Sequence, residues 1–257
     1  MQVNKNRSVT VSVVSHSHSA LVRSLIDSLV ALGSPWVSRV VITSNAPALD
    51  DFQNMPIEGL GFDVKRIDNI QACGFGANHN QAFKQCETEF FCVLNPDIEI
   101  EGDPFAHLVE TLSAPNVGLA YPSQIDGKNA LLDFERELVS PLSIVQRHLL
   151  GQRYESQPGR TVDWVSGSFM VFKSSVFRAL DGFDERYFMY CEDVDICLRT
   201  QLAGYSLARA GAEVVHHARR NTLKRPGHLS WHVRSLLRLW SSASYKEYRR
   251  KFVDLRR

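Results

Sequence analysis

The feature that most constrains the fold is an alternation of short apolar runs with amphipathic segments over the first hundred residues. Runs rich in β-branched residues occupy 8–16 and 38–47, GFDVKRID is a further candidate strand, and EFFCVL begins an apolar run at Glu89. Between the first two runs, leucines recur at helical spacing from Leu21 to Leu32. Strands that alternate with helices predict an α/β fold with a doubly wound, mostly parallel central sheet.

Length and composition fit one large domain, or one domain with an appendage. The chain has 257 residues, of which 44% are hydrophobic and 22% charged. Its five cysteines show no metal-binding spacing, which favours reduced thiols in a cytoplasmic protein over a disulfide framework. The N-terminus lacks an apolar stretch of signal-peptide length, and no window is long enough to span a bilayer. We therefore expect a cytoplasmic protein, either free or peripheral at the inner face of the cytoplasmic membrane.

Charge is distributed unevenly along the chain. From Arg219 to Arg257 there are twelve Lys or Arg residues and two acids, a net of +10, so the preceding residues carry a net of −9. This stretch also contains apolar residues at helical spacing, namely Leu229, Val233, Leu236, Leu237 and Trp240. We interpret 219–257 as a basic helical extension of a domain formed by 1–218. It is expected either to contact an anionic surface such as a membrane or to pack on the domain as a solvated helix.

Three polar residues follow hydrophobic strands directly: His16, Asn45 and Asp97. Open α/β sheets bind ligands at the carboxyl ends of their strands, so we expect these residues to gather along one rim. A carboxylate there can hold a divalent metal on the oxygens of a diphosphate. The alternative for Asp97 is a cap on the turn after the strand.

The stretch ACGFGANHNQAF is a candidate anion or nucleotide site. Gly74 and Gly76 allow a close approach of the backbone to a ligand, and Asn80 offers hydrogen bonds near a helix start. An ordinary capped loop is the alternative.

Two adjacent histidines, His216 and His217, end a strand and precede Arg219 and Arg220. A neutral imidazole is a good metal ligand, but neighbouring strand residues face opposite ways, so at most one points into the rim. A surface histidine pair is the alternative.

Three acids lie close together in FMYCEDVDICLR: Glu192, Asp193 and Asp195. Val194, Leu198 and Leu202 recur at helical spacing, so the acids fall at the start of a helix, where its dipole favours them. A carboxylate in this semi-apolar setting is also a candidate general base.

Taken together, these segments resemble glycosyltransferase family 2, and within it the bacterial rhamnosyltransferase-like enzymes of O-antigen, lipopolysaccharide and cell-wall polysaccharide synthesis. The matching stretches are VSVVSHSHSALV, CGFGANHNQAF, FFCVLNPDIEI and the long block from DWVSGSFM through GFDERYFMYCEDVDICLR to VVHH, with WHVRSLLR at the end. The resemblance implies a GT-A fold with a nucleotide-binding half at about 8–100 and an acceptor-binding half at about 101–218. It also implies a nucleotide-diphosphate sugar donor, Mg²⁺ or Mn²⁺, and inversion at the anomeric carbon.

The resemblance assigns roles to individual residues. Asp193 matches the catalytic base, and Asp97 and His216 match the metal ligands, with Asn95 where the first Asp of a full DxD motif would stand. The implied nucleotide-sugar contacts are His16, Asn45, Gly74, Gly76, Asn80, Asn95, Arg219 and Arg220. The implied acceptor contacts are Asp163, Trp164, Tyr190 and Glu192.

The resulting expectation is transfer of L-rhamnose from dTDP-rhamnose to an acceptor, either a saccharide or a saccharide linked to a lipid diphosphate. Two alternatives stay open: a relative that uses a UDP- or GDP-sugar, and a nucleotide-sugar-binding module without catalysis. The sequence contains no finger, helix-turn-helix or interleaved aromatic and basic residues, so no nucleic-acid partner is expected.

Overall fold

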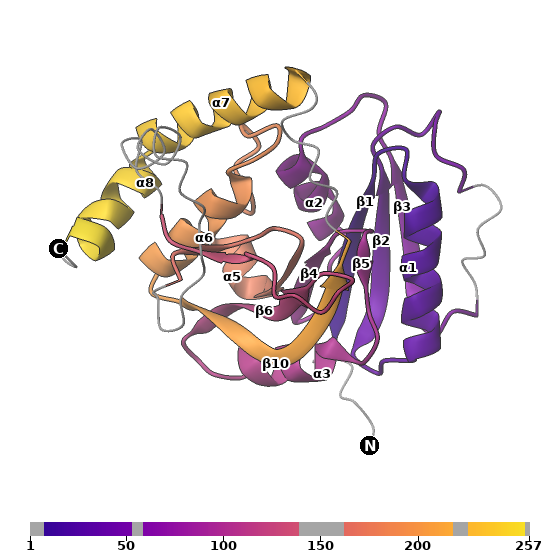
Figure 1. The fold of residues 1–257 in the computed structure, drawn as a ribbon. Helices are drawn as coiled ribbons and strands as arrows, with labels where there is room; N and C mark the ends of the chain where they lie inside the picture. The colour runs from indigo at the N-terminus through magenta and orange to yellow at the C-terminus, as the bar shows by residue number, and fades with distance from the viewer. Residues whose placement is uncertain (1–7, 53–58, 139–161, 218–225, 255–257) are drawn as a thin grey trace.

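A computed structural model describes residues 8–52, 59–138, 162–217 and 226–254 (Figure 1). The elements of the first half are β1 (Val9–Ser15), α1 (Ser19–Leu32), β2 (Val37–Ser44), β3 (Asp63–Asp68), α2 (Phe75–Phe83), β4 (Phe90–Leu94), β5 (Ile98–Glu99), α3 (Pro104–Leu112) and β6 (Val117–Ile125). Those of the second half are β7 (Glu135–Arg136), β8 (Trp164–Val165), β9 (Phe169–Lys173), α5 (Ser174–Ala179), α6 (Glu192–Leu202), β10 (Ser206–His216), α7 (Pro226–Ser241), α8 (Ala243–Tyr248) and the π-helix η3 (Arg249–Val253).

The central sheet has eight strands in the order β3-β2-β1-β4-β9-β6-β10-β5. β1 pairs in parallel with β2 and β4, β2 with β3, and β6 with β10. All five residues of β4 are buried, as expected of a strand covered on both faces. The predicted α/β class and mostly parallel sheet are therefore confirmed.

β9 lies antiparallel between β4 and β6, and this insertion shapes the functional edge of the sheet. Leu94, the last residue of β4, pairs with Phe169, the first residue of β9. The segment 163–168, which leads into β9, therefore lies at the same edge as the turn that follows β4. The Asn-Pro-Asp sequence forms that turn, between the end of β4 at Leu94 and the start of β5 at Ile98.

Helices cover both faces of the sheet (Figure 1). One core contains residues of α1 and α3 such as Leu25 and Leu108, and the other contains residues of α5 and α6 such as Phe177 and Ile196. Local chemistry sets the helix ends. The Asp103 side chain accepts a hydrogen bond from the backbone N–H of Phe105 at the start of α3.

The C-terminal helices pack against α6 in a third apolar cluster. Leu239 and Tyr248 are buried in it, and Leu236 and Trp240 are partly buried against it. The predicted apolar stripe of α7 is therefore divided, because its other members are exposed: Leu229, Val233 and Leu237. Within the described parts of the chain, no helix has the length and hydropathy needed to cross a bilayer.

Candidate active site

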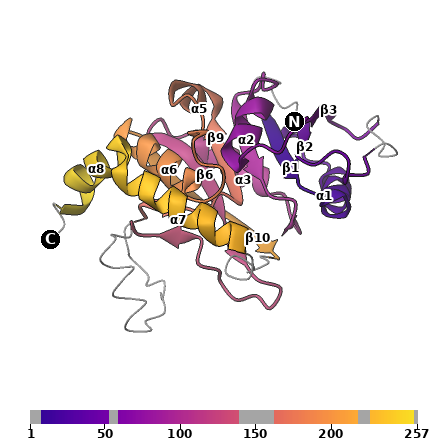
Figure 2. The ribbon, with the colours of Figure 1, turned by 90° about the horizontal axis from the view of Figure 1, so that it is seen from above.

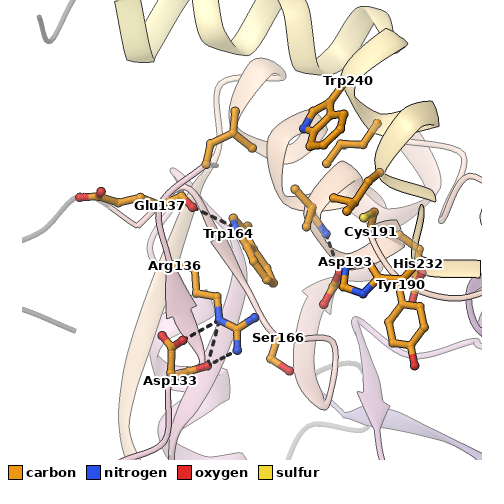
Figure 3. Close-up of a pocket in the computed structure, with 15 residues that line it drawn as sticks. Asp133, Arg136, Glu137, Trp164, Ser166, Tyr190, Cys191, Asp193, His232 and Trp240 are labelled. Carbon is orange, nitrogen blue, oxygen red and sulfur yellow. Dashed lines mark hydrogen bonds and ion pairs between the residues drawn. The ribbon is translucent and has the colours of Figure 1, made fainter. Parts of the chain in front are cut away.

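A cavity of about 430 Å³ lies between the start of α6, the β7–β8 hairpin and the inner face of α7. Figure 3 shows Trp164 on one side of it, Asp193 and His232 on the other, and Trp240 from α7 above. The lining residues are Asp133, Arg136, Glu137, Leu138, Trp164, Ser166, Tyr190, Cys191, Glu192, Asp193, Val194, His232, Leu236, Leu239 and Trp240. The cavity thus combines a mostly apolar wall with a few converging carboxylates, as small-ligand sites do.

Two backbone hydrogen bonds orient the carboxylate of Asp193 in this cavity. Its Oδ2 accepts a hydrogen bond from the N–H of Gly167 at 3.2 Å, and its Oδ1 accepts one from the N–H of Val194 at 2.8 Å. Burial raises the pKa of Asp193, and these two backbone hydrogen bonds and the charge of Arg136 oppose that rise. A carboxylate with a raised pKa, held in one orientation beside a cavity, has the properties of a general base.

The chain reaches Asp193 through a backbone conformation that non-glycine residues rarely adopt. Tyr190 and Cys191 have φ values of +72° and +66°, both in the left-handed region. Such a conformation costs free energy and persists where the surrounding structure enforces it, often at functional sites. Here it turns the aromatic loop before α6 so that Tyr190 and Asp193 face the same cavity (Figure 3).

Glu192 precedes Asp193 and is buried, with 6% of its surface exposed. Its Oε2 atom has no hydrogen-bond partner among the described residues. Burial and the neighbouring charge of Asp193 raise the pKa of Glu192 well above its ordinary value. Glu192 therefore brings to the cavity wall a polar atom that no described residue satisfies.

Asp195, the third acid of the cluster, has a structural role. Its Oδ2 accepts a hydrogen bond from Nε of Arg199 at 2.6 Å, and its Oδ1 accepts one from the hydroxyl of Ser244 in α8 at 2.7 Å. The ion pair with Arg199 lies within α6, the hydrogen bond from Ser244 joins α6 to α8, and Asp195 does not line the cavity.

Aromatic side chains form two sides of the cavity. The ring of Tyr190 stacks on His232 of α7 with centroids 4.9 Å apart, and its hydroxyl lies 2.8 Å from Nδ1 of His228. On the other side, the guanidinium of Arg136 lies 5.0 Å from the ring centroid of Trp164. These walls suit the apolar face of a sugar ring.

A second polar site forms where β10 pairs with β5. Nε2 of His216 lies 3.6 Å from Oδ1 of Asp97, and that oxygen is buried without a hydrogen-bond partner among the described residues. The antiparallel register of His216 with Ile98 brings the two side chains together. His217 points elsewhere, because its Nε2 lies 2.7 Å from Oε2 of Glu99 in an exposed pair.

The orientation of His216 fits a metal ligand. Its Nδ1 lies 2.9 Å from Oε1 of Gln124, which is only an acceptor and also accepts from the hydroxyl of Ser168. Nδ1 therefore carries the hydrogen, and Nε2 directs its lone pair toward Asp97. An imidazole lone pair and an unpaired carboxylate oxygen that face each other are a suitable donor pair for a divalent cation.

The donor set contributed by the protein is small. No group of three or more His, Cys, Asp or Glu side chains suited to a metal occurs in the ranges that the structure describes. The Asp97–His216 pair thus leaves most coordination positions to oxygens from outside the protein, such as those of a diphosphate or water.

The segment 166–168 connects the two sites. Gly167 donates its N–H to Asp193, and the next residue, Ser168, donates its hydroxyl to Gln124, which holds His216. Sequence reasoning missed Gly167, Ser168 and Gln124. The signal available was a polar glutamine in the otherwise apolar strand VGLAYPSQI.

At the carboxyl ends of β1 and β2, the structure also shows a residue to which the sequence assigned no role. Asp50 accepts hydrogen bonds from the hydroxyls of Ser15 and Ser44, each at 2.6 Å. His16 is exposed next to this position, and Asn95 is half-buried in the turn after β4. The rim predicted from strand order therefore exists, with Asp50 on it.

Four predicted nucleotide contacts have structural roles instead. Asn45 uses both polar atoms of its amide on the backbone of Cys73, and Asn80 uses both of its own on the backbone of Phe183. A Cβ on Gly74 would lie 2.7 Å from the carbonyl oxygen of Phe188, and a Cβ on Gly76 would lie 2.6 Å from the Cβ of Phe183. The two glycines thus permit close packing of the protein on itself, which corrects the expectation that a ligand approaches them.

Asp163 is corrected in the same way. It is 2% exposed and accepts hydrogen bonds from the N–H of Leu138 and the hydroxyl of Tyr248. It therefore anchors the C-terminal helices and does not line the cavity, whereas Trp164 beside it does. Arg219 and Arg220 lie outside the described residues.

Comparisons with known proteins agree with this geometry. Residues 100–245 match the family described as "Glycosyl transferase family group 2". The chain is 27% identical over 251 residues to the rhamnosyltransferase WbbL of Escherichia coli (strain K12), covering 90% of this chain and 91% of that protein. It is 31% identical over 163 residues to the N-acetylglucosaminyl-diphospho-decaprenol L-rhamnosyltransferase of Mycobacterium tuberculosis (strain CDC 1551 / Oshkosh), covering 57% of this chain and 53% of that protein.

Among solved structures, the fold is similar to that of the mannosyltransferase PcManGT from Pyrobaculum calidifontis in complex with GDP-Man and Mn²⁺. The TM-score is 0.61 at 17% identity, over 90% of this chain and 64% of the other. At this identity the likeness establishes the GT-A fold.

Proposed function

This chain belongs to glycosyl transferase family group 2 and is rhamnosyltransferase-like, and on that premise we propose that it transfers L-rhamnose from dTDP-rhamnose to a saccharide linked to a lipid diphosphate. The proposed location is the inner face of the cytoplasmic membrane. The observation that carries the proposal is the oriented carboxylate of Asp193 in a cavity, tied through Gly167 and Ser168 to the Asp97–His216 pair. A base and a diphosphate site held by one short segment are what a single displacement at an anomeric carbon requires.

The reaction begins with an acceptor hydroxyl in the cavity beside Asp193. Asp193 takes the proton of that hydroxyl as its oxygen attacks the anomeric carbon of the donor sugar. The bond from this carbon to the diphosphate oxygen breaks on the opposite side, so configuration inverts and the nucleoside diphosphate leaves. The raised pKa of Asp193 favours this proton transfer, because it makes the carboxylate a stronger base.

Asp97 and His216 are the residues that would hold Mg²⁺ or Mn²⁺. When bound, the cation would neutralise charge on the leaving diphosphate. Gln124 contributes by keeping the hydrogen of His216 on Nδ1, which leaves Nε2 free as a donor atom.

The remaining residues divide between the two substrates. For the acceptor, Trp164 and Tyr190 supply aromatic walls, and Glu192 offers a hydrogen-bonding atom through its unpaired Oε2. For the nucleotide sugar, we assign His16, Asn95 and Asp50. A carboxylate at the carboxyl ends of β1 and β2 suits the hydroxyls or N–H groups of a nucleoside, and Asp50 retains lone pairs beyond those that the two serines use.

The donor is tested by thermal unfolding with dTDP-, UDP- and GDP-sugars in the presence of Mn²⁺ or Mg²⁺. A ligand that binds the folded state raises its melting temperature, and we expect the largest rise with dTDP-rhamnose. Asp97→Asn should reduce this rise, because it removes a diphosphate-side ligand. A larger rise with a UDP- or GDP-sugar would overturn the rhamnose assignment. Donor binding without transfer to any lipid-linked saccharide would favour a non-catalytic binding module.

A further inference from the structure

Helix α7 carries apolar residues on two sides, and the rest of the described chain covers only one of them. Its inner side packs into the third apolar cluster through Leu239, with Leu236 and Trp240 beside it. The outer stripe, which we define as Leu229, Val233 and Leu237, repeats every four residues with side chains 48%, 50% and 60% exposed. A surface helix normally presents charged or polar residues on its outer face. Figure 2, seen from above, shows α7 lying across the front of the described chain with no other element over it.

The surroundings of the outer stripe are basic. Arg234 and Ser230 line the same shallow hollow as the three apolar residues. The elements that follow α7 add exposed cations at Lys246, Arg250 and Lys251. Between 226 and 254 the acids are Glu247 and Asp254, and Asp254 pairs with Arg249. An apolar stripe with an arginine beside it, on a C-terminal segment with more basic than acidic residues, is the pattern of a helix that lies in the interface of an anionic bilayer.

The size of the outer stripe argues against a protein partner. Three half-exposed side chains provide far less than the roughly 800 Å² per partner that a stable protein interface buries. Insertion into the headgroup region needs no such area, because each buried apolar group contributes and the basic residues add attraction to anionic lipid.

The inner side of the same helix closes the cavity that contains Asp193. His232, Leu236 and Trp240 belong both to α7 and to the cavity wall. The cavity is therefore about one helix diameter, roughly 10 Å, from the outer stripe. A saccharide anchored in a bilayer beneath α7 would be within reach of the cavity.

We propose that the outer face of α7 binds an anionic lipid surface, with Leu229, Val233 and Leu237 inserted among the headgroups, Arg234 beside them, and the exposed cations of α8 and η3 adding longer-range attraction. This surface would present a lipid-linked acceptor to the cavity, a consequence that rests on the proposed function. The lipid contact itself does not depend on the chemistry of transfer.

The test is co-sedimentation of the full chain with vesicles of phosphatidylcholine, alone or with phosphatidylglycerol, in the absence of donor and acceptor. We expect binding to the anionic vesicles and a partition coefficient lower by about tenfold or more for the variant Leu229→Ser/Val233→Ser/Leu237→Ser. The matched control replaces three exposed apolar residues elsewhere, Leu49→Ser/Ile70→Ser/Leu131→Ser, and should bind like the unmodified protein. Charge reversal at Lys246, Arg250 and Lys251 to Glu should also weaken binding, and more strongly at low salt.

Thermal unfolding checks that the variants are folded, which is expected because the replaced side chains are exposed. Equal binding of the outer-stripe variant and the unmodified protein would overturn the proposal, as would no binding to anionic vesicles. A concentration-dependent dimer that the outer-stripe variant abolishes, without vesicle binding, would assign the surface to a second copy of the chain instead. Loss of transfer with intact vesicle binding would count against the proposed function alone.

Discussion

Nε2 of His216 and Oδ1 of Asp97 face each other at 3.6 Å, the first at the end of β10 and the second in the turn before β5. Gln124 accepts a hydrogen bond from Nδ1 of His216, which leaves Nε2 as the acceptor nitrogen of the neutral imidazole. This arrangement is unfavourable for two acceptors alone and becomes favourable when a cation lies between them. The His216–Asp97 pair is therefore the place at the end of the sheet where we expect the cation that assists the proposed transfer.

Metal dependence follows from this pair. We expect chelation of divalent cations to stop transfer, and His216→Ala to raise the Mn²⁺ concentration for half-maximal rate by about 100-fold. His217→Ala is the matched control, because this neighbour pairs with Glu99 in an exposed position and should leave the Mn²⁺ requirement unchanged. Rates measured across a Mn²⁺ titration decide the question. Equal Mn²⁺ requirements for the two variants would contradict the assignment.

The rate should depend on pH through Asp193. Burial raises its pKa and Arg136 lowers it, and only the ionised form accepts a proton. kcat/KM should therefore fall as pH drops through a value above the ordinary aspartate pKa of about 4. Arg136→Gln removes the lowering charge and should move this acid limb to higher pH. Arg209→Gln, at an exposed arginine paired with Glu135, should not. If Arg136→Gln leaves the acid limb of the kcat/KM profile at the same pH, ionisation of Asp193 does not cause that limb.

Asp195 should matter for stability and not for chemistry. Asp195→Asn breaks the buried pair with Arg199, which we expect to lower the free energy of unfolding by about 2 to 4 kcal/mol. The rate per folded molecule should change little, because Asp195 does not line the cavity. Denaturant unfolding and active-site-normalised rates measure the two effects. A variant that is stable but inactive would show that Asp195 takes part in the reaction.

The packing role of Gly76 is tested by Gly76→Ala. The added Cβ would lie 2.6 Å from the Cβ of Phe183, so we expect the free energy of unfolding to fall by about 1 to 3 kcal/mol. Gly102→Ala is the control, because nothing lies within 4 Å of a Cβ at that position. Unchanged stability with weaker donor binding in Gly76→Ala would restore the original ligand-approach interpretation.

The sequence predicted the sheet well because its signal is local. Each strand and helix of the first hundred residues has its own periodicity, and the order of the strands brings their carboxyl ends to one edge. The sequence patterns alone did not predict that Asp97 and His216 lie together; that prediction came from the family resemblance. The geometry then depended on the short antiparallel strand β5, which sequence patterns do not reveal.

The errors share a physical cause. Asn45, Asn80 and Asp163 are polar residues whose partners lie far away in the chain, such as Phe183 for Asn80 and Tyr248 for Asp163. A polar residue next to a predicted site looks the same in sequence whether it binds a ligand or the protein backbone. Gln124 and Gly167 were missed for the converse reason, because their roles come from the antiparallel insertion of β9 at the functional edge.

The central claim is that Asp193 is the base, and Asp193→Asn tests it most directly. The folded protein raises the pKa of this carboxyl, so its contribution to stability is full below the unfolded pKa and is lost as pH rises through the folded pKa. A neutral asparagine avoids this loss, but its single amide oxygen can accept from only one of the two backbone N–H groups that Asp193 satisfies, so the melting temperature is measured beside the rate to show that the variant is folded. We predict donor binding close to that of the unmodified enzyme and a kcat lower by about 10²- to 10⁴-fold. Near-normal turnover by Asp193→Asn would contradict the account.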